Sequence, residues 1–236
     1  MNKLMRIRQT PEQKVYWVSD THLNHNKPFV YGVRGHKSSD EHTNFIIDKI
    51  NEIVRPNDIL MHGGDFCLNT EEGGLNSLLA RIHCQNIYVT WGNHNNPLWK
   101  IYQREVKSVL QGVALQNLHF SGDISEIKEW ENFEVYPFRY KNVVFLGNYA
   151  EITVDGQYFV LCHYPIHVWN YVKDGCKMIC GHSHYGLPFS QADNLGAKIL
   201  DVGWDGYSRP LSTDEVNAIM DTKSIFQTGD HHEKRT

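Results

Sequence analysis

The 236-residue sequence lacks the features that mark membrane, secreted and disulfide-rich proteins. No stretch approaches the 18 or more consecutive apolar residues of a membrane-spanning helix. The first residues, MNKLMRIRQTPEQK, lack the apolar segment of a secretory signal peptide. The five cysteines are odd in number and include no CxxC pair, so they indicate neither a disulfide framework nor a zinc ribbon. We therefore expect reduced thiols in a cytoplasmic protein that makes no membrane contact.

A strong excess of charge of either sign is also missing, because 23 basic and 27 acidic residues give a formal net charge of −4. This balance and the lack of a basic stripe argue against long nucleic acid as a partner. The 41% hydrophobic content is enough for one sizeable core. Because internal repeats and low-complexity linkers are missing, we predict a single domain over residues 1–236, with a core over about 14–223 and a polar tail over 224–236. The sequence defines no oligomeric state.

The first half of the chain alternates apolar strands with amphipathic helices, which predicts an α/β layered domain. Ser38 followed by Glu41 is a capping-box signal for the start of the first long helix. In each unit a polar cluster follows the strand, at the end where open α/β sheets bind ligands. The predicted strands span 15–18, 59–61 and 86–91, and the predicted helices begin at 38, near 75 and at 97.

The second half is richer in strands. Asp155-Gly156 is a hairpin turn signal between two of them, and Ser212 with Glu215 is a second capping-box signal that begins a last helix. Residues 111–142 lack clear periodicity, and we expect a packed irregular segment there. The predicted strands of this half lie within 142–147, 150–154, 158–163, 177–184 and 197–204.

Carboxylates and imidazoles collect where these strands end. Asp20 and His22 follow the first strand, and residues i and i+2 of an extended segment point to the same side, so both can reach one point. An isolated Asp-x-His is most often a solvated strand end, but five such motifs in one chain favour a metal site. The full set is Asp20, His22, Asp65, Asn93, His94, His163, His182 and His184.

In their order these motifs resemble the calcineurin-like metallophosphoesterase superfamily, whose pattern is D-x-H, G-D, G-N-H-D/E, H and G-H-x-H. The resemblance extends over about residues 14–205, and the SDTH opening is similar to that of small prokaryotic and phage phosphoesterases. It implies an α/β (α+β) fold with a four-layer β-sandwich of two mixed sheets flanked by helices. This expectation replaces the single open sheet that the alternation of elements favours.

The resemblance also implies two divalent metal ions that share one carboxylate. Mixed imidazole and oxygen ligands suit manganese, which we place first, and also iron, zinc or nickel. The implied ligands of one ion are Asp20, His22, Asp65 and His184, and those of the other are Asp65, Asn93, His163 and His182.

The implied reaction is hydrolysis of a phosphomonoester or phosphodiester by a hydroxide that bridges the two ions, with a small phosphate ester or a nucleotide as the substrate. His94 would face the substrate, where it stabilises the phosphoryl group or protonates the leaving group. Asn95 stands where the family usually has Asp, and we expect it to orient His94. The alternative is a non-catalytic binding scaffold with the same fold.

Other polar residues carry weaker hypotheses. His25 could contact substrate from the rim of the site, or be a solvated loop residue. Arg34 and Lys37 could bind a phosphate, or belong to an ordinary charged loop. We interpret His62 as structural. The histidines at 231 and 232 lie in the predicted polar tail.

Overall fold

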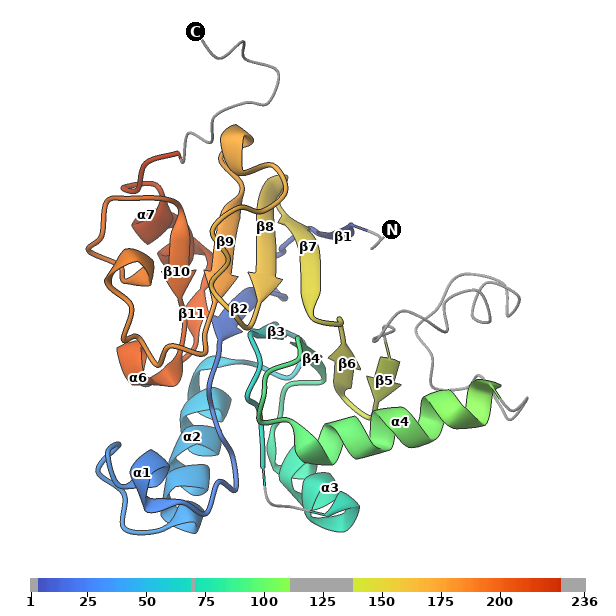
Figure 1. Cartoon of the computed structure of the whole chain (residues 1–236). Coiled ribbons are helices and arrows are strands. Elements are labelled where there is room, and N and C mark those ends of the chain that lie inside the picture. The colour runs from blue at the N-terminus through green and yellow to red at the C-terminus, as the bar shows by residue number, and fades with distance from the viewer. Residues whose placement is uncertain (1–3, 69–70, 111–137, 226–236) are drawn as a thin grey trace, which may run out of the picture.

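The computed structural model of the chain describes residues 4–68, 71–110 and 138–225. Two mixed β-sheets pack face to face, and helices flank them (Figure 1), which confirms the predicted fold class. The six-stranded sheet has the order β11 (Leu211–Ser212), β2 (Val15–Val18), β3 (Ile59–His62), β4 (Asn86–Val89), β6 (Val143–Phe145), β5 (Phe138–Tyr140). The five-stranded sheet has the order β1 (Met5–Ile7), β7 (Tyr149–Val154), β8 (Gln157–Cys162), β9 (Lys177–Cys180), β10 (Ile199–Asp201).

The main core fills the space between the two sheets. Alternate side chains of β2 and β3 point into it, and the ring of Trp17 lies 5.0 Å from that of Phe159 on β8. Helix α7 (Thr213–Met220) closes this layer with Val216 and Met220. Strands buried on both faces need near-continuous apolar sequences, which is what β2, β3 and β9 have.

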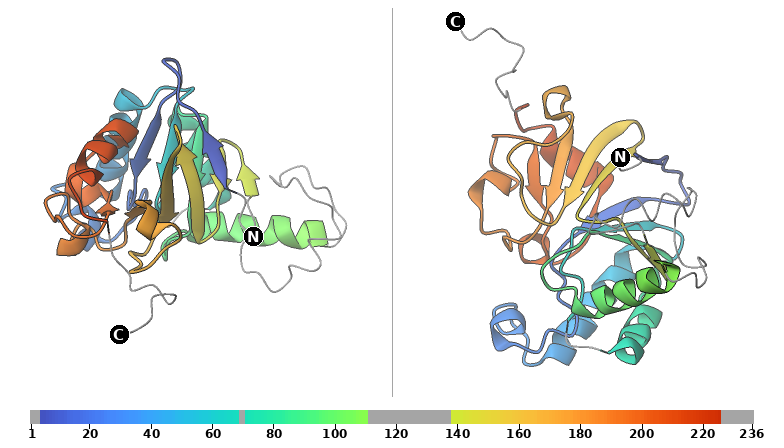
Figure 2. Two further views of the ribbon diagram at one scale, coloured as in Figure 1. Left: turned by 90° about the horizontal axis from the view of Figure 1, so that it is seen from above. Right: turned by 45° about the vertical axis from the view of Figure 1, so that its right-hand side comes forward.

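Helices cover the outer face of the six-stranded sheet. Figure 2 (right) shows the helices of the first half, coloured blue to green, on one side of the six-stranded sheet, and the strands of the five-stranded sheet, mostly yellow to orange, on its other side. The outer face of the five-stranded sheet packs against Trp169 and the short 3₁₀ helix η1 (Val172–Asp174). The covering helices are α2 (Ser39–Ile53), α3 (Glu72–Arg81) and α4 (Asn96–Leu110).

The parallel strands bring their carboxyl ends together at one edge of the molecule. Strands β2, β3, β4 and β6 run parallel in one sheet, and β8, β9 and β10 run parallel in the other. The loops after β2 and β10 join the two sheets there, because Ser19 N–H donates to Val202 O and Trp204 N–H donates to Ser19 O. The predicted polar motifs therefore converge on this junction.

Several local predictions were wrong. Strand β1 pairs in parallel with β7, so the core begins before residue 14. Strand β5 forms within the segment expected to be irregular, of which residues 111–137 lie outside the described part. A short helix, α1 (Pro28–Tyr31), with Pro28 at its first position, forms between the first predicted strand and the helix predicted from residue 38, where no helix was predicted. Helix α2 does begin at the predicted N-cap, because Ser38 Oγ accepts from Glu41 N–H, but the capping box is incomplete, since the Glu41 carboxylate accepts from Lys37 N–H and not from Ser38 N–H.

Three further observations bear on the predictions. Two other short elements, η2 (Pro188–Ser190) and α6 (Trp204–Tyr207), follow the last predicted motif. Most of the predicted polar tail, including residues 231 and 232, lies outside the described part of the chain. Within the described residues, no helix combines the length and apolar character needed to cross a bilayer.

Candidate metal centre

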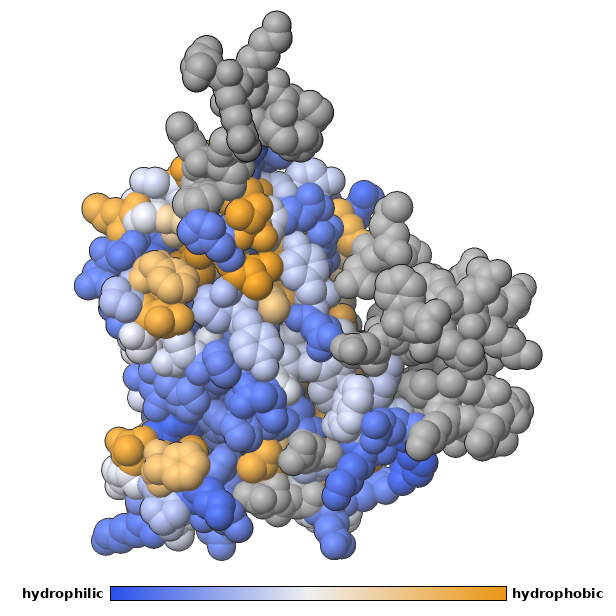
Figure 3. Space-filling model, viewed as in Figure 1, coloured by the Kyte–Doolittle hydropathy of each residue, from blue (hydrophilic) through white to orange (hydrophobic). Residues whose placement is uncertain are grey.

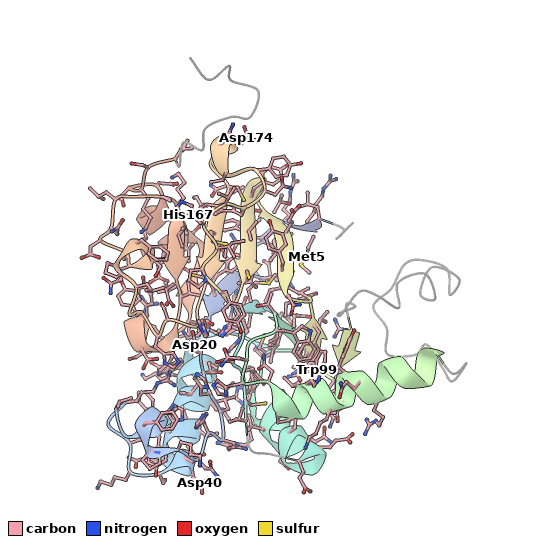
Figure 4. All side chains as sticks on the ribbon, in the orientation of Figure 1. Met5, Asp20, Asp40, Trp99, His167 and Asp174 are labelled. Atoms are coloured by element: carbon pink, nitrogen blue, oxygen red, sulfur yellow. The ribbon has the colours of Figure 1, made fainter. Side chains whose placement is uncertain are left out.

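The predicted ligands converge at the junction of the two sheets. Figure 4 shows Asp20 near the middle of the molecule, between the sheets above and helix α2 below. Backbone hydrogen bonds fix the neighbouring loops against one another, since Asp20 N–H donates to Gly64 O and His22 N–H donates to Asp65 O. Sequence positions more than 160 residues apart thus form one cluster, as the hydrogen bond from His182 N–H to Asp20 Oδ2 shows.

The first predicted ligand set gathers around the Nε2 atom of His22. This nitrogen lies 3.2 Å from His184 Nε2, 3.6 Å from Asp65 Oδ2 and 4.0 Å from Asp20 Oδ1. Asp20, His22 and His184 each offer a ligand atom within 4.8 Å of the other two. These three residues can therefore face one ion, and Asp65 adjoins them through its contact with His22.

The second predicted set gathers around the Nε2 atom of His163. It lies 3.1 Å from Asn93 Oδ1 and 3.5 Å from Asp65 Oδ1, and Asn93 Oδ1 lies 3.0 Å from His182 Nδ1. The two oxygens of Asp65 thus face different sets, as a shared carboxylate must. Asp20 also comes within 4.8 Å of ligand atoms of Asp65 and His163, so it lies closer to the second set than the resemblance implies.

The backbone of the ligand loops adopts a conformation that most residues avoid. Left-handed φ angles at non-glycine residues are uncommon and cost on the order of 1–3 kcal/mol each when the structure enforces them. Such strain is typical of functional sites. The left-handed ligands are Asp20 (φ 56°), His22 (47°), Asp65 (54°), His182 (65°) and His184 (50°).

Two glycines allow the ligand loops to approach this closely. A Cβ atom at Gly92 would collide with the carboxylate of Asp65, and one at Gly181 would collide with Ser19 Oγ and Asp20 Oδ2. The glycines of the GNHN and GHSH motifs therefore have a steric reason that the spacing of polar residues alone does not show.

The donor atoms suit a cation. Gly63 O accepts from His163 Nδ1 at 2.9 Å, and a carbonyl can only accept, so Nε2 of His163 presents a lone pair to Asp65 Oδ1. Burial lowers the pKa of His163, and it lowers the pKa of His22 far below its usual range, so both imidazoles are neutral. Neutral imidazoles and carboxylates that aim lone pairs at each other fit a divalent metal ion.

Asp20 is fully buried, and burial together with the nearby Asp201 raises its pKa to about 8. A buried carboxylate is costly unless a positive charge compensates it. A metal ion at this position would supply that compensation.

His94 lies beside the ligands without joining either set. Its backbone N–H donates to Asp65 Oδ1 at 2.8 Å, which fixes the main chain, and its half-buried ring lies 5.4 Å from the ring of His22. His25 is buried, and its ring lies 5.7 Å from that of His94. Burial and His94 lower the pKa of His25.

Asn95 does not orient His94 as predicted. Its side chain is buried, and its Oδ1 accepts from Phe66 N–H at 2.8 Å, which joins the GNHN loop to the GGDF loop. Its Nδ2 has no hydrogen-bond partner within the described part of the chain. The geometry gives Asn95 a structural contact rather than a catalytic one.

Two hypotheses were open for Arg34, a phosphate contact or an ordinary charged loop, and its hydrogen bonds argue against the phosphate contact. Nε and one Nη donate to the carboxylate of Asp205 at 2.9 and 2.5 Å, and that Nη also donates to Asp20 O. The other Nη faces Thr21 O at 3.4 Å and His42 Nε2 at 2.9 Å. All five guanidinium N–H groups have partners, and the side chain is only 5% exposed, so no donor remains for a phosphate.

Asp205 is a site residue that the sequence reasoning missed. Its Oδ2 lies 2.8 Å from His184 Nδ1, on the side of the ring opposite the atom that faces His22. Burial would raise the pKa of Asp205, but His184 and Arg34 hold it far below its usual range. The hydrogen bond also raises the pKa of His184. The one feature of the sequence that could have identified Asp205 is its position after β10, at the same edge as the predicted motifs.

His62 has the structural role that its position suggested. It is fully buried, its Nε2 donates to Thr21 Oγ1 at 2.9 Å, and its Nδ1 accepts from Gly64 N–H at 3.2 Å. Thr21 in turn donates its hydroxyl proton to Phe66 O. These bonds hold the first and second motif loops together.

No family model and no curated protein matches the chain. A crystal structure of a protein of unknown function from Aquifex aeolicus is similar in fold, with a TM-score of 0.50 over 88% of this chain and 99% of that chain. The two sequences are 17% identical, so this similarity concerns the fold alone.

Proposed function

We propose that the protein is a phosphoesterase that uses two divalent metal ions to hydrolyse a phosphomonoester or phosphodiester. Manganese is the metal that we place first among the candidates. The observation that supports this most strongly is the position of Asp65. Its Oδ2 lies 3.6 Å from His22 Nε2 and its Oδ1 lies 3.5 Å from His163 Nε2. One carboxylate between two nitrogen-rich ligand sets is typical of two-metal hydrolases of phosphate esters.

The residues around this carboxylate form two sets, one for each proposed metal ion. Two bound divalent ions polarise the phosphoryl oxygens and supply a hydroxide nucleophile near neutral pH. Asp20, His22 and His184 would hold one ion beside Asp65, while Asn93, His163 and His182 would hold the other.

His94 is the candidate for contact with substrate. It belongs to neither ligand set, its main chain is anchored to Asp65, and its ring is half-buried at the edge of the cluster. An imidazole in this position can donate a proton to the leaving oxygen or a hydrogen bond to the phosphoryl group. The buried ring of His25 contacts the rings of both His94 and His22.

The alternative remains a binding scaffold that holds metal without turnover. Scaffolds of this kind usually lose ligands or the histidine beside them. Here all seven predicted ligands and His94 are present, and the ligands are brought within reach of each other, which favours the enzyme.

A substrate panel with Mn²⁺ tests the proposal. We expect turnover of phosphomonoesters, phosphodiesters or nucleotides by the wild type, and loss of turnover in Asp65→Ala. His94→Gln should keep its metal while kcat falls by about 10²–10⁴-fold, because general acid help has that typical value. The loss should be smaller for nitrophenyl esters, whose leaving group departs without a proton. Bound metal with no turnover of any ester would favour the scaffold.

A further inference from the structure

A row of aromatic rings leads from the candidate centre to the surface. The ring of His25 lies 5.4 Å from that of His22, a predicted ligand, and 5.7 Å from that of Phe29. His94 lies beside this row, with its ring 5.4 Å from that of His22 and 5.7 Å from that of His25. The contact between His25 and Phe29 is edge-on, with an interplanar angle of 70°. An edge-to-face contact covers at most one face of the Phe29 ring, and the side chain is 70% exposed, so a face of the ring is open to a further planar group.

Phe29 is unusually exposed for a residue connected to a buried site. It lies on α1 and is 70% exposed, while His25, which it touches, is 2% exposed. In Figure 3 hydrophilic residues form a band across the middle of the face, and apolar residues gather beside it over α1. Single exposed apolar residues are common and need no explanation. Phe29 differs from them because it ends the row of rings.

The direction of this row matches the path of a leaving group. In one of the two roles proposed for His94 it protonates the leaving oxygen, and the rest of the leaving alcohol then extends away from the predicted metal ligands past His94. His25 contacts His94, and Phe29 contacts His25, so Phe29 is the exposed ring on this side of the candidate centre. Arg34 has no free donor for a second phosphate here. Phe29 is apolar, so it does not recognise a charged group either.

We infer that Phe29 is the stacking platform for the base of a nucleotide substrate, which makes nucleoside phosphates the substrate class. The inference rests on the proposed function for the position of the phosphate. Aromatic side chains bind bases of any sequence, because every base has a planar face. The base would stack on Phe29 while the phosphate faces the metal ligands, with the ribose between them.

Two ligands that differ only in the base test this inference. They are the methylene phosphonates of adenosine and of ribose, analogues of AMP and ribose 5-phosphate in which carbon replaces the ester oxygen, so neither is hydrolysed. We expect calorimetry with the Mn²⁺-loaded protein to give a dissociation constant about 5- to 150-fold lower for the adenosine compound, the usual range for one stacked base. Phe29→Ala should remove this preference without weakening the ribose compound. Val33→Ala, a change at a neighbouring residue that is 77% exposed, should leave it intact.

Equal affinity of the two phosphonates for the wild type, or a preference that survives Phe29→Ala, would overturn the inference. That result is separate from a failure of the proposed function, which the hydrolysis panel decides. If the base preference depends on Phe29 but the protein turns over no ester, the inference that Phe29 binds a base stands and the proposal that the protein is an enzyme fails.

Discussion

Single residues outside the ligand sets control how the ligands face the centre. Arg34 donates to the carbonyl oxygens of Asp20 and Thr21 and to both oxygens of Asp205, which in turn holds His184 Nδ1. One guanidinium thus connects the first and the last ligand motif. Partners of this kind fix the ring orientation of a metal ligand and raise its basicity.

Replacement of Asp205 should therefore weaken metal binding. Asp205→Asn keeps the size of the side chain but removes the charge that pairs with Arg34 and His184. We expect the affinity for Mn²⁺ to fall by about 10- to 100-fold, the usual effect of losing such a partner. Titration calorimetry of the metal-free protein measures this directly. Asp174→Asn is the matched control, because Asp174 lies at the far end of the molecule (Figure 4).

An unchanged affinity in Asp205→Asn would show that His184 needs no support from this carboxylate. A similar loss in Asp174→Asn would show that the effect is not specific to the site.

The sequence revealed which polar residues gather at the strand ends better than it revealed the partners around them. Asp20, His22 and Asp65 stand directly after apolar strands, so local pattern reveals them. Arg34 and Asp205 are 171 positions apart, and only the folded chain reveals that each satisfies the other. Asn95 was assigned to His94 because the two are adjacent, whereas its side chain points back to Phe66.

At the scale of elements, α7 illustrates a local signal that the fold uses as predicted. Ser212 Oγ accepts from Glu215 N–H, and the carboxylate of Glu215 accepts from Ser212 N–H, which completes the capping box. Arg209 pairs with the same carboxylate at 2.5 Å. These contacts lower the pKa of Glu215 to about 2, with Arg209 as the largest cause.

This lowered pKa predicts a pH-dependent contribution to stability. Ionised Glu215 stabilises the fold above its unfolded-state pKa of about 4.3, and the stabilisation is lost as the pH falls toward 2. The side chain is 42% exposed, so solvent screening limits the ion-pair part to less than about 1 kcal/mol. Urea denaturation should give Glu215→Gln a lower free energy of unfolding at pH 7, with the difference shrinking between pH 5 and pH 2. A difference that stays constant with pH would contradict this, and Asp214→Asn, in the same turn, is the control.

Elements that depend on distant partners were harder to predict. Strand β1 has three residues, and its pairing partner β7 lies more than 140 positions away. Strand β5 is equally short and pairs with β6. Strands of this length have too few residues for alternation to be visible, so their pairing, not their own sequence, defines them.

At the scale of the whole molecule, the candidate centre exists only where the two sheets meet. Asp20, Asp65 and Asn93 come from loops of the six-stranded sheet, whereas His163, His182 and His184 come from the five-stranded one. The core between the sheets, with Trp17 against Phe159, therefore sets the distances within the centre. Metal binding should in turn stabilise the packing of one sheet on the other.

Metal stoichiometry tests the central claim, a carboxylate shared by two ions, most directly. Each variant is saturated with Mn²⁺ and freed of unbound metal. Mass spectrometry of the metal then gives the number of bound manganese ions per chain, and circular dichroism checks that the variant is folded. We predict two ions per chain in the wild type and in Asp174→Asn, one in His22→Ala, and fewer than one in Asp65→Ala. Two ions in Asp65→Ala, or none in the wild type, would contradict the account.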